Sequence, residues 1–483
     1  MRKRLLIILS ITLFVATGVW FGVTHKWLYK FSPQEHWMTI FVHGSFGSIL
    51  GFLNFSDVIS DHVYGTEYQQ ITAKMRNDDF FFRRQAILQQ GLIPFEPSLD
   101  ARRIEPRKFA IYPIVKAYEI INDAVYEGKQ KNYFYAFGWS GLLSQTNRRS
   151  DAIRFYNALC AEVDRLRHQG IHPKIRIITH SHGGNLALNL AAVHKLLTMS
   201  LADEQVKFSS VPQEDESLRE MATLIKKLPS RETARTKFGQ EIWDYVPVDK
   251  TLVVDELIMF ASPMQPETEC FCNAPIFKRV FNLYSGEDWV QRFDWVSSKH
   301  ATVSRQRLTA ITEQQKKWSR IVQARIMVGR PVKNDALVVD YEGDDALATR
   351  QQEQSLFDAL LKGRNVLARK SKDPTHKEMW FLMWNADPEG YDSPLFPLPT
   401  VVMTPLIVKA LDATSDIADA DVDVDVTEKH VVAYVAQHNQ EAVKGKWEID
   451  KSVLTNLQNQ TMALKPTNEV QGDEFNVIYQ YLQ

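Results

Sequence analysis

Short apolar runs alternate with helical stretches from residue 38 onward, which is the pattern of a sheet whose strands are joined by crossover helices. Apolar runs predict strands at residues 37–44, 108–113, 132–141, 174–181, 254–263, 279–286 and 321–328. In residues 150–170, apolar positions recur at helical spacing between a capping serine and a closing glycine. The pattern therefore predicts an α/β fold.

Two segments depart from this alternation. Residues 202–248 are polar and charged, and we interpret them as an insertion at the rim of the sheet. Residues 416–426 alternate acidic and apolar residues, which predicts one strand with a solvated face. A calcium site is the alternative there, although the EF-hand spacing and its glycine are missing. The expected organisation is a segment at 1–30, a main domain at 31–400 and a C-terminal appendage at 401–483.

The N-terminal segment has the pattern of a membrane span. Three basic residues at positions 2–4 precede residues 5–23, which carry no charge and approach the roughly 20 residues that cross a bilayer. We therefore expect a single-pass anchor with a cytoplasmic N-terminus and the main domain on the far side of the membrane. Small residues at 16–18 leave open cleavage as a signal peptide, which would give a secreted protein.

Composition narrows the possible partners. A chain that is 45% hydrophobic and 24% charged is globular, and its formal net charge of -1 gives no strong field to attract nucleic acid. The three cysteines are too few for a disulfide framework, and Cys270 and Cys272 fit a surface loop better than a metal site. The phosphate-loop, dinucleotide and zinc-protease motifs are absent, so we expect no cofactor and no metal.

The stretch RIITHSHGGNLALNLA, residues 176–191, places a serine between two histidines where a strand meets an apolar helix. Catalysis by serine requires an exposed hydroxyl, a neighbouring base and donors for the oxyanion. Gly183 and Gly184 would let the helix start close to the strand and leave Ser181 at the tip of the turn, with the helix N-terminus facing the developing oxyanion. An ordinary serine in a strand-to-helix turn is the alternative.

Residues 179–183, Thr-His-Ser-His-Gly, resemble the nucleophile elbow G-x-S-x-G of lipases and esterases of the alpha/beta-hydrolase fold. Thr179 stands in place of the first glycine. The resemblance covers roughly residues 37–385 and implies a mostly parallel sheet with helices on both faces. A second motif, GWSG at 138–141, has Leu142 where another glycine is needed, so we interpret Ser140 as part of a strand end lining the site.

The stretch TIFVHGSFGS, residues 39–48, resembles the His-Gly motif that follows an early strand in lipases. By this resemblance the oxyanion would be bound by the backbone N–H of His182 and by an N–H of the loop Gly44, Ser45, Phe46. We expect His43 to be a structural histidine that holds this loop rather than a catalytic base.

In this family the acid and the histidine follow the serine along the chain. Asp288 comes directly after the apolar run at 279–284, in the place of the family's catalytic aspartate, although a lone acid at a strand end is more often simply solvated. The histidines that follow it are His300, His376, His430 and His438.

His376 is the histidine that we expect to act as the base. It lies in a Pro-marked loop after a helical stretch at about 346–369. His300 is the alternative, but it lies too near Asp288 for a helix and a strand to intervene. His430 and His438 belong to a helix-like stretch of the appendage.

These observations predict a membrane-anchored serine esterase or lipase that cleaves carboxylic esters through a Ser181–His376–Asp288 triad and an acyl-enzyme. The anchor and the apolar residues 46–55 suggest a lipid or acyl ester as substrate. Two alternatives stay open, namely an acyltransferase with the same triad and a hydrolase-fold binding protein without activity. The sequence does not indicate an oligomeric state.

Overall fold

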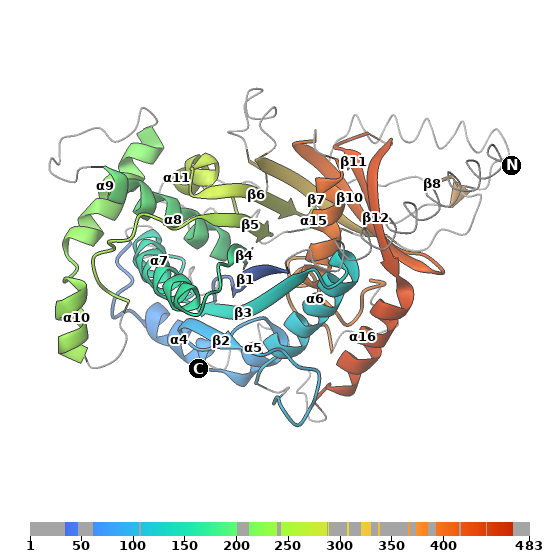
Figure 1. Cartoon of the computed structure of the whole chain (residues 1–483), viewed down its shortest axis with the longest axis horizontal. Coiled ribbons are helices and arrows are strands. Elements are labelled where there is room, and N and C mark those ends of the chain that lie inside the picture. The colour runs from blue at the N-terminus through green and yellow to red at the C-terminus, as the bar shows by residue number, and fades with distance from the viewer. Residues whose placement is uncertain are drawn as a thin grey trace, which may run out of the picture.

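The computed structural model of the chain describes residues 34–46, 61–105, 108–199, 212–238, 243–286, 288, 307–308, 320–329, 337–338, 366–367, 373–384, 393–414, 417–440 and 442–466. Element labels follow Figure 1.

A ten-stranded sheet organises the described residues, with the strand order β12-β11-β10-β7-β6-β5-β4-β1-β3-β2 (Figure 1). The strands from β10 to β3 in this order run parallel, while β2, β11 and β12 pair antiparallel with their neighbours. The strands are Glu35–Val42 (β1), Gly91–Phe95 (β2), Gln130–Gly138 (β3), Lys174–His180 (β4), Val254–Phe260 (β5), Phe277–Tyr284 (β6), Ile321–Gly329 (β7), Asp419–Val426 (β10), His430–Gln437 (β11) and Val443–Asp450 (β12). Leu337–Val338 (β8) and Val366–Leu367 (β9) pair separately.

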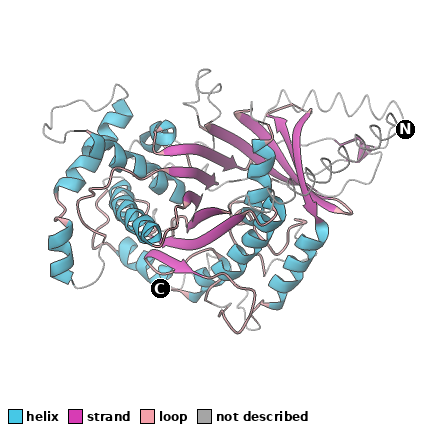
Figure 2. Cartoon of the chain, viewed as in Figure 1, coloured by secondary structure: helices cyan, strands magenta, loops and turns pink. Residues whose placement is uncertain are grey.

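Helices cover both faces of the sheet (Figure 2). They are Glu67–Arg76 (α4), Asp79–Arg84 (α5), Ile111–Tyr126 (α6), Gln145–His168 (α7), Gly183–Thr198 (α8), Pro212–Lys226 (α9), Arg231–Phe238 (α10), Pro266–Glu269 (α11), Thr404–Asp412 (α15) and Lys451–Ala463 (α16), with short 3-10 helices at Cys270–Asn273 and Thr400–Met403.

Two large apolar cores lie on opposite faces of the sheet. One joins the sheet to α6, α15 and α16, and the other joins it to α7, α8 and α9. Ile177 and Ile178 are neighbours in β4 but enter different cores, because successive strand residues point to opposite faces. β4 is therefore apolar on both sides, as expected of a central parallel strand.

The order in which successive strands are added to the sheet reverses at β1. From β1 it runs to β3 on one side, and it then returns to the other side of β1 to form β4. Ligands of open parallel sheets bind at such a switch point, beyond the carboxyl ends of the strands. Val42 and Thr179 pair near the ends of β1 and β4, so the loops after these two strands leave the sheet side by side.

The strands predicted at 37–44, 132–141, 174–181, 254–263, 279–286 and 321–328 are present as β1, β3, β4, β5, β6 and β7. The strand predicted at 108–113 is wrong, because α6 begins at Ile111. Pro113 lies in the first turn of α6, where a helix tolerates a residue without a backbone N–H. The apolar run there is the buried face of a helix.

Residues 419–426 of the acidic-apolar alternation form β10, as predicted, with Ala420, Val422 and Val424 fully buried. The helix-like interpretation of the stretch around His430 is wrong, since residues 430–437 form β11. The β-branched residues of that stretch favour the extended chain. Together with β12 these strands extend the main sheet, so residues 419–450, expected within an appendage, share its core.

The predicted transmembrane helix and single-pass location need correction. Among the described residues, no helix is both long and apolar enough to cross a bilayer. Helix α7 has 24 residues but includes charged ones such as Arg148 and Asp151, and the apolar α8 has only 16 residues. Residues 5–23, on which the prediction and its signal-peptide alternative depend, lie outside the described residues.

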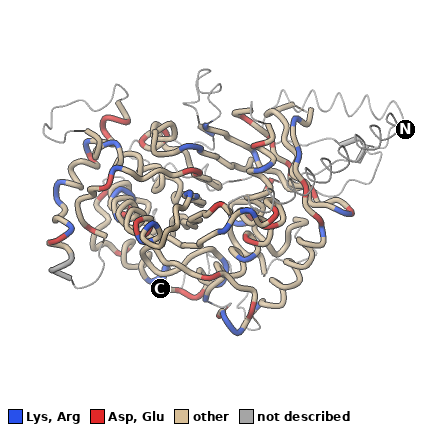
Figure 3. Tube along the Cα trace, viewed as in Figure 1, with Lys and Arg blue, Asp and Glu red and all other residues tan. Residues whose placement is uncertain are grey.

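Charges of both signs are interspersed along the described chain rather than gathered by sign (Figure 3). This distribution agrees with the formal net charge of -1.

Candidate active site

Ser181 occupies a strained turn between β4 and α8. Its φ is 51°, in the left-handed region that a residue with a Cβ enters at a cost of roughly 1–2 kcal/mol. The Ser181 N–H donates to the carbonyl of Phe260 at 2.9 Å, which ties the turn to the end of β5. Strain that the surrounding structure maintains in this way is typical of functional positions.

Two glycines let α8 start directly behind Ser181. A Cβ on Gly183 would lie 2.6 Å from the carbonyl oxygen of His43, and one on Gly184 would overlap the side chain of Ser262. Both positions therefore require glycine, as the sequence suggested. The helix begins at Gly183 with His182 as its N-cap, so its first amide groups lie beside Ser181.

Thr179, which replaces the first glycine of the elbow motif, is accommodated inside the sheet. Its side chain is fully buried, and its hydroxyl donates to the carbonyl of Ile258 on β5 at 3.5 Å. The departure from the motif therefore leaves the strained turn in place.

The loop of residues 43–46, which we call the oxyanion loop, lies against the Ser181 turn. A Cβ added to Gly44 would be only 2.8 Å from the Cβ of Ser181. The Phe46 N–H donates to the carbonyl of Gly141 at 2.9 Å, so the structure assigns it a partner other than an oxyanion. Of the loop positions that the sequence left open, Ser45 is therefore a better donor than Phe46.

His43 orients this loop. Its Nε2 accepts hydrogen bonds from Arg76 at 2.8 Å and from the Trp139 N–H at 3.2 Å, so its Nδ1 carries the proton and donates to the Gly44 carbonyl at 2.6 Å. Because a trans peptide points its C=O and the next N–H in opposite directions, the Ser45 N–H faces away from His43. These contacts agree with the expectation that His43 holds the loop.

We expect Gly44→Ala to lower kcat for ester hydrolysis by roughly 10²–10³-fold, the usual cost of losing an oxyanion donor. The new Cβ would overlap the Ser181 side chain and displace the loop that carries the Ser45 N–H. The measurement is kcat on a short-chain nitrophenyl ester, with Tm as a check of folding. Unchanged kcat in a folded variant would contradict this role of the loop.

Asp288 and His376 meet as predicted. His376 Nδ1 lies 2.8 Å from Asp288 Oδ2, and the Asp288 side chain is fully buried. This contact fixes the ring orientation and leaves Nε2 on the opposite side of the imidazole, as in a catalytic His–Asp pair. Asp288 is therefore not a solvated strand-end acid. Its neighbour Glu287 and the alternative base His300 lie outside the described residues.

His180 joins the His376 backbone to the Ser181 turn, a role that the sequence reasoning missed. Its Nε2 donates to the carbonyl of His376 at 3.1 Å, and the centroids of the two rings lie 4.4 Å apart. The other face of the ring stacks on Trp380 at 5.3 Å. Since His180 directly precedes Ser181, these contacts bring His376 and Ser181 to the same end of β4.

A buried ion pair, Asp373–Arg325, connects the chain segments that precede His376 and Asp288. Asp373 accepts from Arg325 of β7 at 2.9 Å and from the Gly286 N–H at 2.6 Å. It thus connects the loop before His376 to the loop before Asp288. Burial raises the pKa of Asp373 although Arg325 opposes that shift. The sequence gives no signal for this long-range contact.

The turn that carries His376 has a local signature that sequence analysis could have used. Thr375 and Glu378 form a reciprocal pair, in which the Thr375 N–H donates to the Glu378 carboxylate at 2.6 Å and the Glu378 N–H donates to the Thr375 hydroxyl at 3.3 Å. This is the capping-box pattern T-x-x-E, and it fixes the backbone on both sides of His376.

Ser140, His430 and His438, the alternatives from the sequence, lie in other surroundings than Ser181 and His376. Ser140, two residues beyond the end of β3, donates to Asp151 at 2.7 Å. His438 pairs with Asp421 at 2.7 Å across the β10–β11 hairpin, and His430 begins β11. Cys272 is buried within a 3-10 helix, which differs from the expected surface loop.

Burial keeps two of the site's histidines neutral. The pKa of His43 lies well below 6.5, mainly because the ring is buried and also because the positive charge of Arg76 is close to it. The pKa of His180 also lies well below 6.5, mainly because the ring is buried and also because His376 is close to it. Below pH 6.5 the unfolded chain gains protons at these positions while the folded protein does not, so the free energy of unfolding falls as pH falls.

Each of these two histidines is expected to lower the free energy of unfolding by about 1.4 kcal/mol per pH unit below about 6.5, until its folded-state pKa is reached. Urea unfolding at pH 7.5, 6.5 and 5.5 measures the total dependence. His180→Asn removes one titrating group and should make the dependence shallower by that amount per unit. Identical slopes in the variant and the wild-type protein would contradict the neutral, buried His180.

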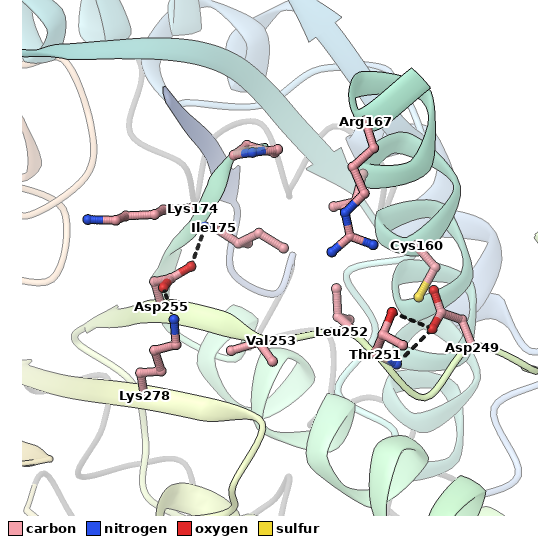
Figure 4. A pocket seen from close by; sticks show the side chains of 12 residues that line it. Cys160, Arg167, Lys174, Ile175, Asp249, Thr251, Leu252, Val253, Asp255 and Lys278 are labelled. Atoms are coloured by element: carbon pink, nitrogen blue, oxygen red, sulfur yellow. Dashed lines mark hydrogen bonds and ion pairs between the residues drawn. The ribbon is translucent and has the colours of Figure 1, made fainter. Parts of the chain in front are cut away.

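A pocket of about 210 Å³ lies at the amino ends of β4, β5 and β6, opposite the strand ends that carry the Ser181 turn (Figure 4). Its lysines are matched by acids, since Lys278 pairs with Asp255 and Lys174 pairs with Glu35, each at 2.6 Å. Among the described residues, no cluster of His, Cys, Asp and Glu could hold a metal ion.

Comparison of the chain with protein-family models, curated proteins and solved structures gave no match.

Proposed function

We propose that this protein is a serine hydrolase that cleaves carboxylic esters, with Ser181 as nucleophile, His376 as base and Asp288 as the acid that orients His376. The observation that carries the proposal is the strained Ser181 turn, which lies against the oxyanion loop at Gly44 and is linked through the preceding residue, His180, to the hydrogen-bonded His376–Asp288 pair. A serine in an ordinary strand-to-helix turn needs neither the strain nor these two neighbours.

The proposed reaction begins when His376 Nε2 takes the hydroxyl proton of Ser181 as Oγ attacks the ester carbonyl. Buried Asp288 accepts the Nδ1 hydrogen bond and stabilises the imidazolium that forms. The N–H groups of Ser45 and His182 bind the oxyanion. His376 then gives its proton to the departing alcohol, which leaves an acyl group on Ser181.

Deacylation uses the same groups in the reverse order. His376 takes a proton from water as the water oxygen attacks the acyl carbonyl, and the proton returns to Ser181 Oγ when the carboxylic acid leaves. An alcohol acceptor in place of water would give an acyltransferase by the same steps, so the acceptor distinguishes the two activities.

Labelling with a fluorophosphonate tests the proposal, because this reagent reacts with an activated serine. We expect stoichiometric modification at Ser181 in the folded protein and loss of modification after denaturation. No reaction at Ser181 in folded protein would reject the enzyme and favour a binding protein. A series of esters of increasing acyl length, with and without an alcohol acceptor, then identifies the preferred acyl group and separates hydrolysis from transfer.

A further inference from the structure

A second pocket, of about 420 Å³, lies outside the Ser181 turn. One face of α4 lines it through Gln69, Thr72, Ala73 and Arg76, at the spacing of successive helical turns, and the other lining residues come from residues 77–90 and 140–142. We call it the Arg76 pocket. Arg76 is the one charged residue among those that line it.

Arg76 brings an uncompensated positive charge to this pocket. Its side chain is 5% exposed, and its two acceptors, His43 Nε2 at 2.8 Å and the Leu88 carbonyl at 3.2 Å, are neutral. A guanidinium has five N–H groups, so these bonds leave donors for a ligand. Arg76 forms no ion pair with a carboxylate of the described residues.

The nearby acid does not remove this charge. Asp151 raises the pKa of Arg76 from a distance, but its own carboxylate pairs with Arg154 at 2.9 Å and accepts from Ser140 at 2.7 Å. Burial lowers the pKa of Arg76 to about 10, which still leaves the group charged at pH 7. A buried charge is costly unless an opposite charge accompanies it.

The pocket in Figure 4 provides the contrast, because there the lysines have carboxylate partners within the protein. The lining of the Arg76 pocket instead consists of one arginine with amide, hydroxyl and apolar side chains. The side chains of Gln89 and Gln90 are exposed at its rim, and their amide groups can donate hydrogen bonds. A positive group surrounded by donors is suited to an anion.

We propose that the Arg76 pocket binds a phosphate or carboxylate group, with the guanidinium of Arg76 as its charged ligand. Planar guanidinium groups match both anions through paired N–H donors. The site is separate from the catalytic residues, and its existence does not depend on the proposed esterase activity. Two hydrogen bonds connect the Arg76 pocket to the oxyanion loop. Arg76 donates to His43, and His43 donates to the Gly44 carbonyl.

Calorimetric titration of the full-length protein with inorganic phosphate, and separately with acetate, tests the proposal at constant ionic strength in sodium chloride. We expect saturable binding of at least one of the two anions, and the comparison identifies which anion chemistry the pocket prefers. The absence of saturable binding by both would overturn the proposal.

Variants of Ala73 locate the binding site without disturbing Arg76. Ala73 is exposed on α4 and lines the pocket three residues before Arg76, so Ala73→Glu places a carboxylate within reach of the guanidinium. We expect anion affinity to fall at least tenfold in Ala73→Glu. Ala73→Gln adds similar volume without charge and should change affinity less than threefold.

Affinity in Ala73→Glu equal to that of the wild-type protein would place the anion elsewhere and overturn the proposal. Equal losses in Ala73→Glu and Ala73→Gln would show steric exclusion rather than charge competition, and would also overturn the role of Arg76. Both substitutions introduce good helix formers on an exposed face, and circular dichroism verifies that α4 and the fold persist.

Discussion

Replacement of Ser181 by alanine is expected to lower kcat for ester hydrolysis by about 10⁴–10⁶-fold, the range seen when a nucleophile of a serine triad is removed. Without Oγ no acyl-enzyme forms, and the rate that remains comes from the oxyanion donors acting on water. The measurement is initial-rate hydrolysis of a short-chain nitrophenyl ester by purified protein, together with loss of fluorophosphonate labelling.

Ser140→Ala is the matched control for Ser181→Ala. Ser140 also follows a glycine-containing strand end, but it donates to Asp151 rather than to a histidine. This variant should keep most of its turnover and its fluorophosphonate labelling. Loss of activity in Ser140→Ala with retention in Ser181→Ala would move the nucleophile to the GWSG motif.

His376→Ala is expected to lower kcat by about 10⁴–10⁶-fold, because Ser181 then has no base to accept its proton. Asp288→Asn should cost roughly 10⁴-fold, since an amide in place of the carboxylate holds the imidazole in the wrong tautomer. The double variant Ser181→Ala, His376→Ala should be no slower than either single variant, because residues of one triad act as a unit. Steady-state kinetics on the same ester measures all four rates.

The chain contains a second His–Asp pair that serves as a control. His438 Nδ1 lies 2.7 Å from Asp421 Oδ1, nearly the distance of the His376–Asp288 contact, but in the β10–β11 hairpin. His438→Ala should therefore retain wild-type turnover, and His300→Ala should retain most of it. If His300→Ala abolished turnover and His376→Ala did not, the base would have to be reassigned.

The parallel core of the fold was predictable because its strands are short apolar runs with clear breaks between them. Residues 108–113 misled the prediction, since Pro113 resembles the end of a strand but is equally compatible with the first turn of α6. Residues 430–437 were interpreted as helix-like but form a strand, because the alanine and valine residues of a buried strand can also fit helical spacing. The periodicity of so short a run does not separate the two structures.

The candidate residues Ser181 and Asp288 were predictable because each follows an apolar run at a recognisable break, and His376 because it lies in a Pro-marked loop after a helical stretch. Their supporting residues were not. His180 stacks on Trp380, and Asp373 pairs with Arg325, across separations in sequence that leave no local pattern. Such contacts arise only when the sheet brings distant strand ends to one edge.

The Asp373–Arg325 pair has a consequence for how the protein acquires its activity. The residues of the candidate site, from Gly44 to His376, come from distant parts of the chain. The contacts of Asp373 with Gly286 and Arg325 require the ends of β6 and β7 to be together. Pairings between distant segments form slowly, because the chain must first close large loops. During refolding, helical circular dichroism should therefore return before reactivity towards fluorophosphonate. The proposed activity would therefore appear only after β6 and β7 have paired.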